Sequence, residues 1–142
     1  MALVDEIYRF KNSTSYQIPL YSCAVSAGFP SPAEEYLEGK LDLNQHLIAH
    51  PLATFFVRVA GDSMIGAGIH EGDLLIVDRA LEAKDGKVVI AVVNGELLVK
   101  RLRFNGTQPY LVAENPNYSA LAITEAMEFQ IWGIVTNVIH AL

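Results

Sequence analysis

The dipeptide Asn94-Gly95, placed between two apolar runs, constrains the fold more than any other feature of this sequence. The runs on either side, residues 88–93 and 96–102, are rich in Val, Leu and Ile. Asn-Gly between such runs is the strongest short-range signal for a β-hairpin, because both central residues of the turn need positive φ. A two-residue turn also sets the register of the two strands, so we expect Val89 to lie opposite Lys100.

Further stretches of aromatic and β-branched residues predict additional strands. Together they indicate a mostly β fold, a compact domain of twisted antiparallel strands that runs from residue 40 to residue 142. A chain of 142 residues suits one domain and buries about 70% of its unfolded surface without needing disulfides or a metal. The additional predicted strands cover residues 54–60, 73–78, 109–113 and 129–140.

The first 39 residues differ from the rest in hydrophobic pattern and composition, and they predict an extended N-terminal arm. Residues 8–21 show no sustained hydrophobic period, and residues 26–32 contain two prolines and a glycine, which oppose both helix and central strand. Short helices are expected at the junction with the β-domain. One begins with Ser31 as cap and ends at Gly39, and another covers residues 44–49.

Composition excludes several classes of protein. No apolar run approaches the roughly 18 residues that a membrane span needs, and acids stand where a secretory signal would be basic and apolar. A single cysteine, Cys23, fits a reducing compartment, so we expect a cytoplasmic protein with no membrane association. The net charge of −6 opposes direct binding to the nucleic-acid backbone.

The hairpin register places Lys100 among leucines, because alternate strand residues share a face. Leu98 and Leu102 lie on its face, whereas Arg101 and Arg103 point the other way. An apolar surrounding disfavours the charged amine and lowers its pKa, and a neutral amine can deprotonate a serine. The alternative is a lysine that extends past its neighbours to water.

Ser63 is the candidate nucleophile. The corner Gly61-Asp62-Ser63-Met64 follows a predicted strand, and we expect it to expose the Ser63 hydroxyl. The backbone N–H groups of Asp62 and Ser63 would then form an oxyanion hole. The alternative is a serine that only caps a helix or stabilises a turn.

Other chemistries are less well supported. The four histidines do not accompany a Gly-x-Ser-x-Gly elbow, and Cys23 has no histidine near it in sequence. His and Cys residues show no metal-ligand spacing, and no phosphate-binding glycine motif occurs. We therefore expect neither a metal nor a cofactor.

Several short motifs, taken in their order and spacing, resemble one known family. The chain is similar to the LexA-type self-cleaving serine peptidases, and among them to the UmuD-type proteins of SOS mutagenesis. That resemblance implies the same LexA/UmuD-like β-domain. The matching motifs are residues 28–33 (GFPSPA), 42–45 (DLNQ), 50–51 (HP), 61–65 (GDSMI), 72–78 (GDLLIVD) and 99–100 (VK).

The resemblance implies a role for individual residues. Ser63 matches the family's nucleophile and Lys100 its general base, which together form a Ser/Lys dyad. The scissile bond of the family corresponds to Ala27-Gly28, so the chain is expected to remove its own first 27 residues. Cleavage in the family is stimulated by RecA filaments on single-stranded DNA.

The resemblance also implies partners. The trimmed protein of the family is a homodimer that acts as a subunit of a UmuC-type Y-family DNA polymerase in error-prone translesion synthesis, and replicative polymerase subunits are further candidate partners. We expect no sequence-specific DNA binding. A LexA repressor needs a helix-turn-helix domain, and residues 1–27 show no helical periodicity.

Two alternatives from other classes stay open at this point. The chain could be a non-catalytic polymerase-interaction module, in which Ser63 and Lys100 are only structural. It could also be a signal-peptidase-like enzyme with the same Ser/Lys chemistry, but that class predicts a membrane anchor that the sequence does not contain.

Overall fold

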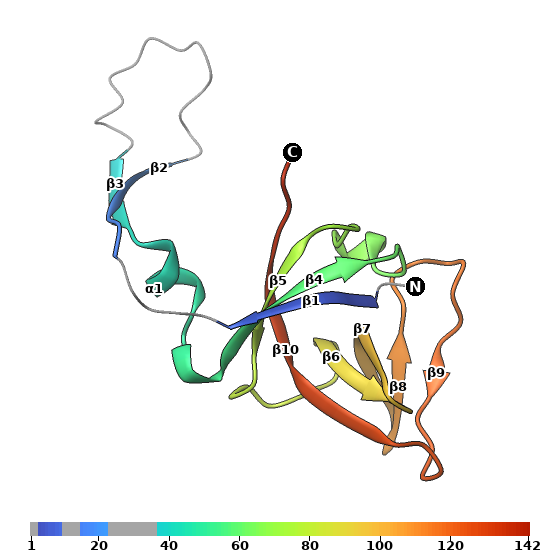
Figure 1. The fold of residues 1–142 in the computed structure, drawn as a ribbon. Coiled ribbons are helices and arrows are strands. Elements are labelled where there is room, and N and C mark those ends of the chain that lie inside the picture. The colour runs from blue at the N-terminus through green and yellow to red at the C-terminus, as the bar shows by residue number, and fades with distance from the viewer. Residues whose placement is uncertain (1–2, 10–14, 23–36) are drawn as a thin grey trace. The chain divides into compact units, whose positions relative to one another are not determined.

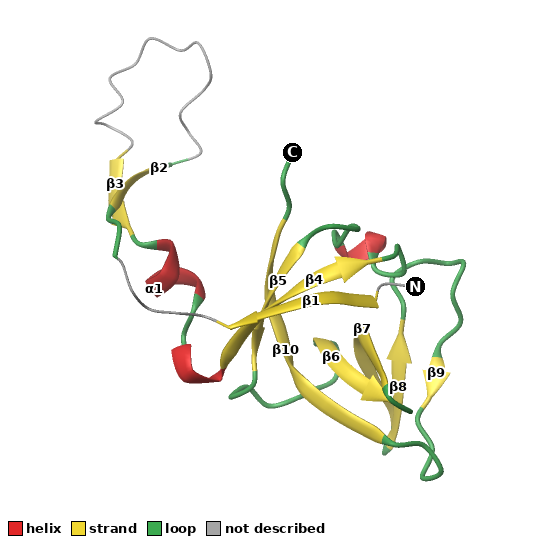
Figure 2. Cartoon of the chain, viewed as in Figure 1, coloured by secondary structure: helices red, strands yellow, loops and turns green. Residues whose placement is uncertain are grey.

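The computed structural model describes residues 3–9, 15–22 and 37–142. The chain divides into two compact units, one formed by residues 1–10 together with 50–142 and the other by residues 11–49. Strands dominate the described residues, and the helices are short (Figure 2). The mostly β fold expected from the sequence is therefore confirmed.

The larger unit is an antiparallel sheet that closes on itself. Its strand order is β1-β4-β5-β10-β6-β7-β8-β9 (Figure 1). β1 also pairs with β7, where Leu3 lies opposite Leu98. The strands from β1 to β7 in this order thus form a ring, and β8 and β9 continue the sheet beyond β7. The strands are β1 (Leu3–Arg9), β4 (Thr54–Ala60), β5 (Leu74–Asp78), β6 (Val88–Val93), β7 (Glu96–Asn105), β8 (Gln108–Val112), β9 (Leu121–Ala122) and β10 (Phe129–Ile139).

The β6–β7 hairpin has the predicted turn and register. Asn94 and Gly95 adopt φ values of 49° and 83°, as a type I′ turn requires. Val93 lies opposite Glu96, and Val89 lies opposite Lys100. The local turn chemistry thus determined which residues of β7 share a face with Lys100.

The smaller unit contains a two-stranded ribbon and one helix. β2 (Ile18–Tyr21) pairs with β3 (Leu37–Leu41). α1 (Leu43–Leu47) follows, with Asp42 as its cap, because Asp42 Oδ1 accepts a hydrogen bond of 2.9 Å from the Asn44 N–H. This helix agrees with the one predicted over residues 44–49.

The helix predicted to end at Gly39 is wrong over its final residues. Residues 37–41 form β3 instead, because pairing with β2 supplies the backbone hydrogen bonds that a helix would otherwise provide. Its predicted start, residues 31–36, lies outside the described residues. The sequence also did not predict β1, β2 or β9. The division into an arm (residues 1–39) and a β-domain (residues 40–142) stays a prediction.

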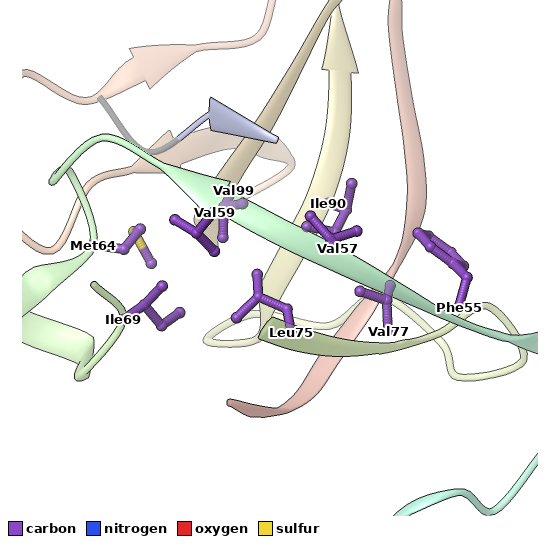
Figure 3. Packing of buried hydrophobic residues seen from close by; sticks show 9 residues of the cluster. All are labelled: Phe55, Val57, Val59, Met64, Ile69, Leu75, Val77, Ile90 and Val99. Atoms are coloured by element: carbon purple, nitrogen blue, oxygen red, sulfur yellow. The ribbon is translucent and has the colours of Figure 1, made fainter. Parts of the chain in front are cut away.

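Two apolar clusters pack on opposite faces of the central strands. The first takes alternate residues of β4 and β5 and adds Met64, Ile69, Ile90 and Val99. Figure 3 shows these side chains gathered along β4, with Met64 and Ile69 at one end. The second cluster takes side chains from β6, β7, β8 and β10, and it consists of Val89, Ala91, Val93, Leu98, Leu102, Leu111, Ile123 and Ile134.

Candidate active site

The corner after β4 positions Ser63. Gly61 has a φ of 85°, a left-handed conformation that favours glycine and lets the chain turn sharply at the strand end. Ser63 and the next residue, Met64, are both fully buried, and Met64 packs in the first apolar cluster. A 3-10 turn, Ile65–Ala67, follows. Met64 thus anchors the corner in the core and holds the Ser63 backbone in place.

Lys100 reaches Ser63 from β7. Its Nζ atom donates a hydrogen bond of 2.9 Å to Ser63 Oγ, across 37 positions of sequence. Lys100 shares its strand face with Leu98 and Leu102, both of which are buried, and only 6% of Lys100 itself is exposed. The structure therefore brings the two residues together in an apolar setting. The hairpin register predicted the leucine neighbours of Lys100, whereas the pairing with Ser63 was implied by the family resemblance.

Burial lowers the pKa of the Lys100 amine below its ordinary value, because the charged form loses its hydration. In the part of the chain that the structure describes, Lys100 has no salt bridge that would favour the charged form. The arrangement can therefore hold an uncharged amine beside a serine hydroxyl, and this is the requirement for general-base activation of serine.

Tyr118 lies against both the lysine and the corner. Its ring centroid is 5.4 Å from Lys100 Nζ, and its hydroxyl donates a hydrogen bond of 2.5 Å to Asp62 Oδ1. The hydrogen bond from Tyr118 lowers the pKa of Asp62 and, in turn, raises the pKa of Tyr118. Tyr118 thus connects the residue before Ser63 to the amine of Lys100.

Asn115 and Glu114 hold the same corner by hydrogen bonds to its backbone. The side-chain Nδ2 of buried Asn115 donates to the Asp62 carbonyl at 3.0 Å. The Gly66 N–H donates to the Glu114 carbonyl at 2.7 Å, and a Cβ at Gly66 would lie only 2.6 Å from that oxygen. Glycine at position 66 therefore permits the close approach of the two segments.

Comparison with known proteins identifies the family of this chain. The family model described as Peptidase S24-like matches residues 19–136. The chain belongs to the peptidase S24-like family. Within that family, it is 46% identical to Protein ImpA of Salmonella typhimurium over 128 residues, which cover 89% of this chain and 86% of ImpA.

Two further relatives place the chain among S24-like proteins. Protein MucA of Escherichia coli is 42% identical over 126 residues, covering 88% of this chain and 86% of MucA. The LexA repressor of Dechloromonas aromatica is 42% identical over 118 residues, covering 82% of this chain and 58% of the repressor. The resemblance to LexA-type serine peptidases and to their UmuD-type branch is confirmed.

The S24-like fold places some of the expected site residues and not others. Ser63 and Lys100 are in contact. The expectation that the corner exposes Ser63 is wrong, because Ser63 is fully buried. Lys100 contacts it, and Asn115 and Tyr118 form hydrogen bonds to the preceding residue, Asp62. The oxyanion role of the Asp62 and Ser63 backbone N–H groups stays a prediction. Ala27 and Gly28, the expected cleavage site, lie outside the described residues.

Sequence reasoning missed Asn115 and Tyr118. Residues 115–117 read Asn-Pro-Asn, which is a turn signal, but nothing in the sequence indicated what the turn would contact. The histidines pair elsewhere: His50 Nδ1 lies 2.6 Å from Asp78 Oδ2, and His140 Nδ1 lies 2.5 Å from Asp73 Oδ1. These pairings give no support to a histidine-based triad.

None of the helices in the described ranges is both long enough and apolar enough to span a lipid bilayer.

Proposed function

We propose that this S24-like protein is a self-processing serine peptidase that cleaves its own chain between Ala27 and Gly28. Ser63 is the nucleophile and Lys100 is its general base. The observation that carries the proposal is the buried contact of 2.9 Å between Lys100 Nζ and Ser63 Oγ. Its support is chemical, since a dehydrated amine and a serine hydroxyl at this distance can exchange a proton.

The reaction proceeds by two acyl transfers. Uncharged Lys100 takes the proton of Ser63 Oγ as that oxygen attacks the Ala27 carbonyl carbon. The backbone N–H groups of Asp62 and Ser63 stabilise the resulting oxyanion. Lys100 then gives the proton to the Gly28 nitrogen, the C–N bond breaks, and a water molecule activated by Lys100 hydrolyses the ester of Ser63 and Ala27.

An intramolecular substrate makes a modest catalyst sufficient. Because the arm is tethered to the peptidase domain, its effective concentration can be high, and one cleavage per molecule is enough. The full burial of Ser63 fits this regulated use, because a buried hydroxyl must become accessible before the arm can bind. A RecA filament on single-stranded DNA would stimulate cleavage by favouring the pose in which the arm occupies the site.

The trimmed product then acts as a homodimer in the cytoplasm. It serves as a subunit of a UmuC-type Y-family polymerase in error-prone translesion synthesis, and it contacts replicative polymerase subunits. This part of the proposal is supported by membership of the family and by the similarity to ImpA and MucA.

The test is incubation of the full chain with RecA, single-stranded DNA and a nucleotide, followed by intact-mass measurement. We expect loss of the first 27 residues, and we expect Ser63→Ala and Lys100→Ala to abolish it. Ser119→Ala and Lys84→Ala are matched controls, because both residues are exposed. An unchanged mass for the unsubstituted protein, also at alkaline pH without RecA, would favour a non-catalytic polymerase-interaction module.

A further inference from the structure

A second group of ionisable side chains gathers away from the Ser63–Lys100 pair. His70 and Asp73 come from the loop before β5, and His140 directly follows β10. One ligand atom from each residue lies within 4.8 Å of the others. Because His140 is 67 positions from Asp73, only the pairing of β10 with β5 brings the group together.

Asp73 provides a fixed carboxylate at the centre of the group. Only 3% of it is exposed. Its Oδ2 accepts a hydrogen bond of 2.8 Å from the His70 backbone N–H, and its Oδ1 lies 2.5 Å from His140 Nδ1. Both oxygens of the carboxylate are therefore held in place by hydrogen-bonding partners.

The two imidazoles are accessible to solutes. The side chains of His70 and His140 are 51% and 45% exposed, and their ring centroids are 4.9 Å apart. His70 Nδ1 lies 3.7 Å from Asp73 Oδ2. Two half-exposed imidazoles thus flank one buried anion, a combination that suits a divalent cation entering from solvent.

We propose that His70, Asp73 and His140 bind one divalent cation of the borderline class, of which Zn²⁺ is the example, with water as the fourth ligand. Neutral imidazole and carboxylate are the ligands that such ions prefer. Adjacent ligand atoms of a tetrahedral site lie about 3.3 Å apart when the metal–ligand bonds are ~2.0 Å. His140 Nδ1 lies 2.5 Å from Asp73 Oδ1, and His70 Nδ1 lies 3.7 Å from Asp73 Oδ2. Each imidazole nitrogen is therefore within about 1 Å of this spacing from a carboxylate oxygen.

Binding requires one local change at His140. The Nδ1 atom, now hydrogen-bonded to Asp73, must be free of its proton to bind a metal. The neutral ring achieves this by carrying its proton on Nε2 instead, so no net charge is lost. The backbone N–H of His70 continues to orient the carboxylate as an outer-sphere contact.

The cation would tie the C-terminal end of β10 to the loop that follows the Ser63 corner. That loop is already bonded to the end of β4, because Gly72 N–H donates to the Val59 carbonyl at 2.8 Å and Val59 N–H donates to the Asp73 carbonyl at 2.9 Å. Metal binding is therefore expected to raise the melting temperature of the β-domain. This inference does not depend on the proposed peptidase activity.

The test is titration of the metal-free full chain with Zn²⁺ against a chromophoric chelator, in a Cys23→Ser background that removes the thiol. We expect one ion per chain, and affinity at least about tenfold lower in His70→Ala and in His140→Ala. His46→Ala is the matched control, because His46 is an exposed histidine outside the group. Zn²⁺ should raise Tm in the parent protein and in His46→Ala only.

Two results would overturn the proposal. One is the absence of saturable binding at about 100 µM free Zn²⁺, a concentration at which a three-ligand site should be occupied. The other is binding that survives both His70→Ala and His140→Ala unchanged while far-ultraviolet circular dichroism shows that the variants are folded. Spectra of the Co²⁺ form would separate tetrahedral histidine ligation from loose surface binding.

Discussion

Lys100 Nζ lies 2.9 Å from Ser63 Oγ, and both side chains are buried. The contact joins the middle of β7 to the corner after β4, and β1 pairs with both of these strands. A lysine in this position loses hydration of its charged form and keeps its nitrogen beside the Ser63 hydroxyl.

The rate of self-cleavage should rise with pH through the pKa of Lys100. Burial lowers that pKa, so the rise should occur below the range of an ordinary lysine and reach a plateau once the amine is neutral. Lys100→Arg should be inactive at every pH, since a guanidinium stays protonated. The measurement is the first-order rate without RecA between about pH 6 and 11. A flat profile with chemistry rate-limiting would contradict the role of Lys100 as the base.

Lys100→Met should stabilise the fold and remove one contribution to the pH dependence of its stability. The pKa of Lys100 is lower in the folded than in the unfolded chain, so the unfolded chain binds more protons between the two values and stability rises with pH across that window. The variant should lack this rise and be more stable by about 1 kcal/mol at neutral pH. Urea unfolding at several pH values checks this, with exposed Lys84→Met as control. Lower stability at neutral pH would contradict the expected cost of burying the charge.

Asn115→Ala should destabilise the protein by about 1–3 kcal/mol, the cost of losing a buried hydrogen-bonding side chain. Asn115 is 7% exposed, donates to the Asp62 carbonyl and accepts from the Asn117 backbone N–H. Because Asp62 precedes Ser63, cleavage should slow as well. Asn117→Ala is the matched control, since the contact of Asn117 with Asn115 uses the backbone N–H, which alanine keeps. Equal stability of the two variants would refute this account.

Gly66→Ala should disturb the same corner by crowding. The added Cβ would lie 2.6 Å from the Glu114 carbonyl oxygen, so one of the two backbone segments must move. We expect a loss of about 1–3 kcal/mol in stability and slower cleavage. Thermal unfolding and the cleavage assay measure the two effects, with exposed Ser119→Ala as control. If stability and cleavage rate were both unchanged, Gly66 and Glu114 would not be in tight contact.

Tyr118→Phe should distinguish the contribution of the Tyr118 hydroxyl from that of its ring. The variant keeps an aromatic face near Lys100 but removes the hydrogen bond that lowers the pKa of Asp62, so that pKa should rise toward its ordinary value. Carboxyl chemical shifts followed by NMR titration measure the change. Self-cleavage should decrease by about tenfold or less, because the nucleophile is positioned less well. An unchanged Asp62 titration would show that the hydrogen bond does not form in solution.

The sequence alone determined the features that depend on neighbours in the chain. Asn94-Gly95 specified its turn and register, so the face of Lys100 followed from local geometry. Runs of aromatic and β-branched residues predicted most strands of the β-domain, and the helix predicted over residues 44–49 forms as α1. Motifs around Ser63 and Lys100 are enough to indicate the family without a structure.

Only the tertiary structure decided which distant segments meet. The burial of Ser63 arises from packing between loops, and so do the hydrogen bonds that join residues 114–118 to Asp62 and Gly66. No short-range pattern specifies these partners. Residues 37–41 became a strand because β2 offered hydrogen bonds that outweigh a local helix signal. The group formed by His70, Asp73 and His140 has no ligand spacing in the sequence, since sheet pairing and not chain proximity brings its members together.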